Sequence, residues 1–100
     1  MSIGVHQEKY TVTTATGSAS QTIRAGGNIC YDILVKAETS STTFDVSLTD
    51  VYGNVTLSRE DNTGELSEQM QKLTYGNWTL DITNASADED FSILLLFRES

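Results

Sequence analysis

The stretch Phe91-Ser92-Ile93-Leu94-Leu95-Leu96-Phe97-Arg98 near the end of the chain decides the fold prediction. Its odd-numbered positions are all large and apolar, which is the two-residue period of a β-strand. Leu94 and Leu96 lie on the opposite face, where a solvated strand carries polar residues. A strand with apolar residues on both faces belongs to a sheet that is covered on both sides. Because a chain of 100 residues rarely covers both faces of a sheet by itself, this strand indicates an assembly.

The same two-residue period recurs in short segments throughout the chain. Residues 29–37, 44–48 and 78–82 alternate apolar with other residues, and clusters such as Gly26-Gly27-Asn28 separate the segments. Glycine and asparagine tolerate the positive φ angles of tight turns. About seven or eight short strands at this spacing are typical of an all-β, antiparallel, jelly-roll-like sandwich.

The inward positions of these segments define the expected core. It consists of Ile23, Ile33, Val35, Phe44, Val46, Leu48, Trp78, Leu80, Ile82, Phe91, Ile93 and Leu95. One segment has a different spacing. Leu66, Met70 and Leu73 recur at i, i+4 and i+7, which predicts either a short helical turn near residues 66–73 or an irregular crossover between sheets. A helix there would be able to cover the outward leucines of the last strand.

The chain is expected to be one domain, residues 9–100, preceded by an N-terminal arm, residues 1–8. The arm carries Ile3 and Val5, and an ordered arm of this kind can add a strand to the sheet edge of a neighbour. The alternative is a frayed terminus. The first residues have no basic region followed by an apolar region, so we expect no signal peptide and synthesis in a cytoplasm.

The charge of the chain excludes two classes of partner. Fourteen acidic residues against six basic residues give a formal net charge of −8. Such a surface repels phosphate backbones and anionic lipid headgroups, so we predict no nucleic-acid binding and no membrane binding. The apolar run near the C-terminus is too short to span a bilayer.

The residues that usually carry catalysis are scarce. His6 and Cys30 are the single histidine and the single cysteine, and we expect an exposed histidine and a buried, unreactive thiol. We therefore predict that the protein is not an enzyme and needs neither a cofactor nor a metal. The acidic stretch Asp88-Glu89-Asp90 leaves a calcium site open as an alternative. Tyr52 and Tyr75 lie in turns and are the expected surface aromatics.

Two resemblances narrow the functional class. The stretch Tyr75-Gly76-Asn77-Trp78-Thr79-Leu80-Asp81-Ile82, followed by the last strand, resembles the closing hairpin of several bacterial and viral β-sandwiches. The spacing of its glycine, tryptophan and leucine also resembles accessory sandwich domains attached to secreted proteases. In size, acidic Ser/Thr-rich composition and β pattern, the whole chain resembles the small decoration or cement proteins of tailed-bacteriophage capsids.

The resemblance to decoration proteins implies a β-sandwich that binds an assembled shell, usually as a trimer, and stabilises it. We therefore predict a structural protein of the virion, made in the host cytoplasm. Its expected partners are the major capsid protein or another virion protein and further copies of itself, with a trimer favoured. The predicted interface residues are Ile3, Val5, Leu94 and Leu96. The alternative function is a small sandwich module that binds carbohydrate or calcium.

Overall fold

The computed structural model describes residues 5–25, 28–74 and 76–99. Within these residues the chain forms eight strands: β1 (Val5–Thr13), β2 (Ala19–Ile23), β3 (Asn28–Ala37), β4 (Thr43–Thr49), β5 (Val55–Thr63), β6 (Glu65–Leu73), β7 (Trp78–Thr83) and β8 (Asp90–Glu99). The described residues include no helix long and apolar enough to cross a membrane.

The strands pair as one long hairpin folded over on itself. Each strand of the first half pairs antiparallel with one of the second half: β1 with β8, β2 with β7, β3 with β6 and β4 with β5. Further pairings of β3 with β8 and of β4 with β7 join these hairpins into two sheets. We call them the β8 sheet, in the order β1-β8-β3-β6, and the β7 sheet, in the order β2-β7-β4-β5.

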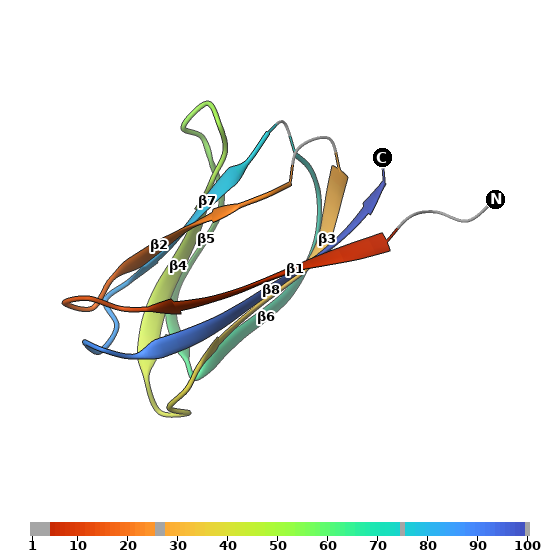
Figure 1. Cartoon of the computed structure of the whole chain (residues 1–100). Coiled ribbons are helices and arrows are strands. Elements are labelled where there is room, and N and C mark those ends of the chain that lie inside the picture. The colour runs from red at the N-terminus through yellow and green to blue at the C-terminus, as the bar shows by residue number, and fades with distance from the viewer. Residues whose placement is uncertain (1–4, 26–27, 75, 100) are drawn as a thin grey trace.

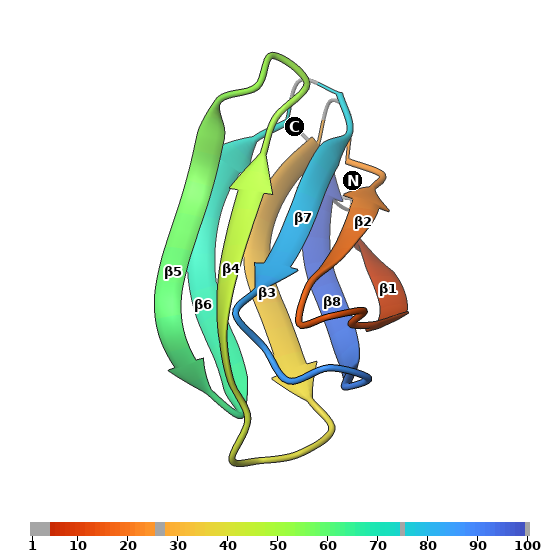
Figure 2. The same cartoon turned by 90° about the vertical axis from the view of Figure 1, so that its left-hand side faces the viewer.

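The two sheets lie face to face (Figure 1), with β1 and β2 along one side of the sandwich and β5 and β6 along the other (Figure 2). Eight strands in two antiparallel sheets with this pairing form a jelly roll. The prediction of an all-β, antiparallel, jelly-roll-like sandwich is therefore confirmed.

The core fills the space between the sheets. All the residues predicted to form it are buried, none of them more than 1% exposed. The rings of Phe44 in β4 and Phe91 in β8 meet edge to face with centroids 4.9 Å apart, which is a favourable aromatic geometry. The two-residue period therefore identified the inward face of the central strands correctly.

β3 departs from the regular alternation that its sequence predicts. Its register with β8 shifts between Cys30 and Asp32, so Tyr31 is an extra residue relative to β8 and forms a β-bulge. The register with β6 shifts at the same place, where Met70 and Gln71 lie opposite Tyr31. Because a bulge reverses the alternation of side chains, Cys30 faces the core, while Ile29 and Tyr31 are only partly buried. From Ile33 onward, the residues of β3 that were predicted to face the core are buried.

The helical alternative for residues 66–73 is wrong, because this segment lies in β6. The chain passes from the β7 sheet to the β8 sheet at Gly64, whose φ of +75° favours glycine. Leu66 and Met70 are four residues apart, a spacing that shares one face in a strand as well as in a helix, and both are buried. Leu73 breaks the strand period and is exposed. β6 extends the β8 sheet beside β3 and does not cover its outer face.

We expect Trp78→Ala to lower the free energy of unfolding by about 3–5 kcal/mol, because it removes a large ring from the middle of the core. Urea denaturation followed by circular dichroism measures the change. Tyr52→Ala is the control, since that ring is 77% exposed and its loss should change the stability by less than about 0.5 kcal/mol. A loss below about 1 kcal/mol for Trp78→Ala would contradict its central place in the core.

Candidate interaction surfaces

The outer face of the β8 sheet is apolar at its centre. Leu94 and Leu96 point away from the core and are half-buried. In the strand register Leu94 lies between Leu34 of β3 and Lys9 of β1, and Leu96 lies beside Asp32. A shallow pocket of about 130 Å³ lies among the leucines. We call Leu34, Leu94 and Leu96 the outer leucine face; it combines two predicted interface residues with one that the sequence did not single out.

A second row with three apolar residues and one arginine crosses the same outer face near the strand ends. The register places Val5, Arg98, Ile29 and Leu73 side by side across the four strands. Val5 is 61% exposed and Leu73 is 45% exposed. The predicted interface residue Val5 therefore lies on the same outer face as Leu94 and Leu96, with Arg98 between Val5 and Ile29.

Part of the segment expected to be an arm belongs to the sheet. Residues 5–8 are the first residues of β1 and pair with β8. Ile3, the other predicted interface residue of this segment, lies outside the described residues. His6 is exposed, as expected, and its ring stacks on that of Phe97, directly opposite in β8, with centroids 5.2 Å apart and an interplanar angle of 16°.

The outer face of the β7 sheet has a different chemistry. The outward positions of β2, β7 and β4 are exclusively serine, threonine and aspartate: Ser20, Thr22, Thr79, Asp81, Thr83, Thr43, Asp45, Ser47 and Thr49. Hydroxyl and carboxylate groups are well solvated, so this face needs no cover. The two outer faces of one small sandwich thus differ sharply in polarity.

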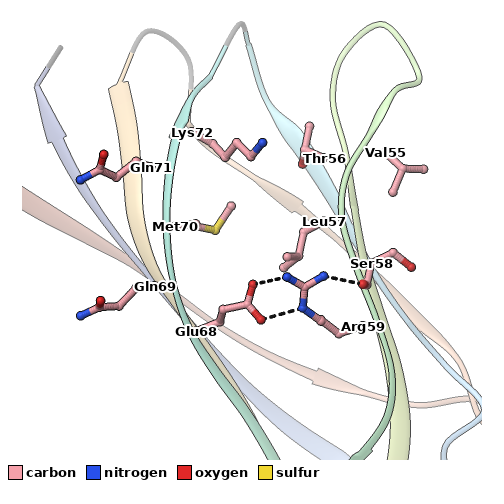
Figure 3. Close-up of a pocket in the computed structure, with 10 residues that line it drawn as sticks. All are labelled: Val55, Thr56, Leu57, Ser58, Arg59, Glu68, Gln69, Met70, Gln71 and Lys72. Atoms are coloured by element: carbon pink, nitrogen blue, oxygen red, sulfur yellow. Dashed lines mark hydrogen bonds and ion pairs between the residues drawn. The ribbon is translucent and has the colours of Figure 1, made fainter.

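A groove of about 460 Å³ runs between the edge strands β5 and β6 (Figure 3). Arg59 of β5 donates two hydrogen bonds to Glu68 of β6, from Nε to Oε1 at 2.7 Å and from Nη2 to Oε2 at 2.6 Å. Hydrogen bonding to the Glu68 carboxylate raises the pKa of Arg59. The bidentate Arg59–Glu68 pair bridges the two sheets beside Leu57 and Met70. The opposite charges of the two side chains neutralise each other.

The histidine and the cysteine are not brought together in a reactive site. Cys30 is fully buried in the core, and burial raises the pKa of its thiol to about 11. The expectation that this cysteine acts as a small apolar residue is confirmed. In the described parts of the chain, no group of three histidine, cysteine, aspartate or glutamate side chains could hold a metal ion.

The acidic loop before β8 is tied into the backbone around it. The Glu89 carboxylate accepts hydrogen bonds from the Thr39 N–H at 2.7 Å and from the Thr42 hydroxyl at 3.3 Å. The Glu89 N–H donates to the Thr14 hydroxyl oxygen at 3.0 Å, and the Thr13 hydroxyl donates to Asp90 at 2.5 Å. These bonds connect three loops at one end of the sandwich.

The surface aromatics do not form a platform within the described residues. Tyr52 is strongly exposed at the turn between β4 and β5, as expected. Among the described residues it is the one Phe, Tyr or Trp whose ring is strongly exposed. Tyr75 lies outside the described residues. Tyr10 packs partly against the core. A row of stacked rings, which many carbohydrate sites use, is therefore not built here.

No family model and no curated protein matches this chain. Solved structures do share its fold. One is a chain from Bacillus endospore appendages, which are described as disulfide-linked pili. It has a TM-score of 0.64 at 17% identity, and the match covers 100% of this chain and 91% of the appendage chain. The pre-peptidase C-terminal domain of collagenase from Bacillus anthracis has a TM-score of 0.60 at 13% identity, covering 90% and 88%.

The SPBc2 prophage-derived protein YomS is a third structure with this fold. Its TM-score is 0.53 at 16% identity, and the match covers 91% of this chain and 95% of YomS. Identities this low establish a shared fold and leave the function to be argued from the surfaces of the molecule.

We expect the Cys30 thiol to resist alkylation in the folded protein. At pH 8 a thiol with a pKa of about 11 is almost entirely protonated, and the thiolate is the reactive form. Iodoacetamide should therefore label the native protein at least about 100-fold more slowly than the urea-unfolded protein. Mass spectrometry of timed samples measures both rates, and equal rates would contradict the buried position.

We expect Glu89→Ala to lower the free energy of unfolding by about 1–3 kcal/mol, because it leaves the buried Thr42 hydroxyl and the Thr39 N–H without their acceptor. Thermal and urea denaturation measure the loss. Glu38→Ala is the matched control in the neighbouring loop, since its side chain is exposed and its removal should cost less than about 0.5 kcal/mol. Equal effects of the two variants would contradict a structural role for the Glu89 carboxylate.

Proposed function

We propose that this protein is a non-enzymatic structural protein of a virion, which decorates an assembled capsid by binding through its outer leucine face. The observation that carries the proposal is the apolar centre of an outward sheet surface. Leu34 and Leu94 lie opposite each other in β3 and β8, the two central strands of the β8 sheet. A sandwich that works alone would carry polar residues there, as the β7 sheet does.

The charges around the outer leucine face are of both signs. Lys9, Lys36 and Arg98 lie on the outer face of the β8 sheet, and the acidic residues Asp32 and Glu65 lie there too, with Glu65 directly opposite Lys36. Within the described residues the one ion pair joins Arg59 to Glu68, elsewhere on the molecule. Charges of both signs around an apolar centre suit a partner surface that also carries both signs.

The mechanism is stabilisation by binding. A protein that binds the assembled shell and not its separated subunits shifts the equilibrium toward the shell. Burial of two leucines contributes about 3–5 kcal/mol before the cost of association, so each contact is weak. A homo-oligomer, which the resemblance to decoration proteins suggests is a trimer, would bind through several such contacts at once and gain avidity.

The comparisons support a structural or binding role at a coarser level. The fold is shared with a prophage-derived protein and with a chain of spore-appendage pili. It is also shared with the collagenase domain, so the fold is equally compatible with the second candidate function, a small sandwich module that binds carbohydrate or calcium. Binding to an assembled particle distinguishes the first candidate from the second.

We expect the double variant Leu94→Glu with Leu96→Glu to lose binding to purified capsids of the virion proposed as the partner. Charged residues cannot be buried at the interface without a large desolvation cost. Co-sedimentation measures binding, and size-exclusion chromatography with light scattering measures the oligomeric state. The control is Thr22→Glu with Ser58→Glu on the outer face of the β7 sheet, which should bind like the wild type.

Wild-type protein that fails to co-sediment, or a leucine variant that binds normally, would contradict the proposal. Circular dichroism establishes whether the variants fold. If the two glutamates prevent folding, the variant Leu94→Ser with Leu96→Ser replaces them in the test. Serine is one of the residues found on the outer face of the β7 sheet. Serine variants that fold and still bind would equally contradict a docking role.

A further inference from the structure

The side of the sandwich formed by β1 and β2 holds a polar pocket that the proposed function does not use. Its volume is about 320 Å³. β1 and β2 lie on the opposite side of the sandwich from β5 and β6, which line the groove of Figure 3 (Figure 2). This volume is at the small end of the range for small-molecule sites. Its lining comes from several strands and loops: His6, Glu8, Arg24, Ala25, Asn28 and Asn77.

Hydrogen bonds fix the polar groups on one wall of the pocket. The Tyr10 hydroxyl donates to Oε1 of Glu8 at 2.8 Å, and the Arg24 N–H donates to the same hydroxyl oxygen at 3.0 Å. Burial raises the pKa of Tyr10, so the hydroxyl keeps the proton that it donates. Glu8 retains a second carboxylate oxygen as an acceptor. β1 and the end of β2 are thereby held together at the pocket.

The opposite wall is fixed by a buried threonine. The Thr74 hydroxyl donates to the Ala25 carbonyl at 2.6 Å, and its oxygen lies 3.2 Å from the Asn28 N–H, which donates to it. Thr74 is 1% exposed. The stacking of His6 on Phe97 orients the imidazole ring at the edge of the pocket. These bonds hold the Glu8 side chain and the backbone at Arg24, Ala25 and Asn28 before a ligand arrives, which lowers the entropy lost on binding.

The chemistry of this lining selects a class of ligand. The guanidinium of Arg24 and the amides of Asn28 and Asn77 are donors, while the Glu8 carboxylate and the amide oxygens are acceptors. The charges of Arg24 and Glu8 cancel, which disfavours a simple anion or cation. Sugar hydroxyl groups both donate and accept hydrogen bonds. We propose that this pocket binds a neutral saccharide.

The pocket and the outer leucine face lie on opposite sides of β1. Glu8 faces the pocket, and the next residue, Lys9, lies beside Leu94 on the outer face. Saccharide binding is therefore independent of docking through the leucines, and a docked subunit would still present the pocket to solvent. The proposal goes beyond the structural role and does not depend on it.

Nuclear magnetic resonance titration of the full chain tests the site. The probes are maltotriose, cellotriose, mannotriose and tri-N-acetylchitotriose, with inorganic phosphate as the anionic comparison. We expect at least one trisaccharide to produce saturable shifts in the amide signals of His6, Arg24, Asn28 and Asn77, and phosphate to produce none. No saturable shift with any of the four sugars, or saturation by phosphate alone, would overturn the proposal.

The matched variants are Arg24→Ala and Lys9→Ala. Both remove one exposed basic side chain, but only Arg24 lines the pocket. We expect Arg24→Ala to weaken binding of the active trisaccharide by at least about tenfold, the effect of losing a hydrogen bond to a charged group. Lys9→Ala should leave the affinity unchanged. Equal affinities of the two variants would overturn the proposed site.

Discussion

The double pairing of β8 is the constraint on which the structure depends. β8 forms backbone hydrogen bonds with β1 on one side and with β3 on the other. Its inward residues, among them Phe91 and Phe97, fill the core, and Leu94 and Leu96 face outward from the middle of the sheet. β8 therefore joins β1 to the rest of the sheet, completes the core and provides the apolar residues of the outer surface.

The sequence alone predicted the class of fold and the inward residues of the central strands, because the two-residue period is directly readable. It did not predict the bulge at Tyr31, since Ile29, Cys30 and Tyr31 are all compatible with burial. It misread β6, because a spacing of four residues fits a strand face and a helix face equally. Leu34 has an apolar residue on either side in the sequence, as Leu94 does. Only the strand register shows that these two leucines lie next to each other on one surface. The pocket between β1 and β2 is built from distant segments and required the tertiary structure.

The surface chemistry is divided among the faces and sides of the molecule. The outer leucine face lies on the β8 sheet, the hydroxyl groups cover the β7 sheet, and each open side carries a groove or pocket of its own. The single cysteine is buried, so copies of the folded chain have no thiol available for covalent linkage. This differs from the Bacillus endospore appendages, described as disulfide-linked pili, one chain of which shares the fold.

The pairing of the first strand with the last also sets the order in which the molecule can be made. β1 has a single neighbour within its sheet, and that neighbour is β8. During synthesis β1 emerges from the ribosome first and must wait for the final strand before its backbone groups find partners. Sheets dominated by such distant pairings fold slowly, because the closing of a long loop precedes the contacts that stabilise it. The sandwich therefore closes only once β8 has been made, and until then the backbone groups of β1 that pair with β8 are exposed.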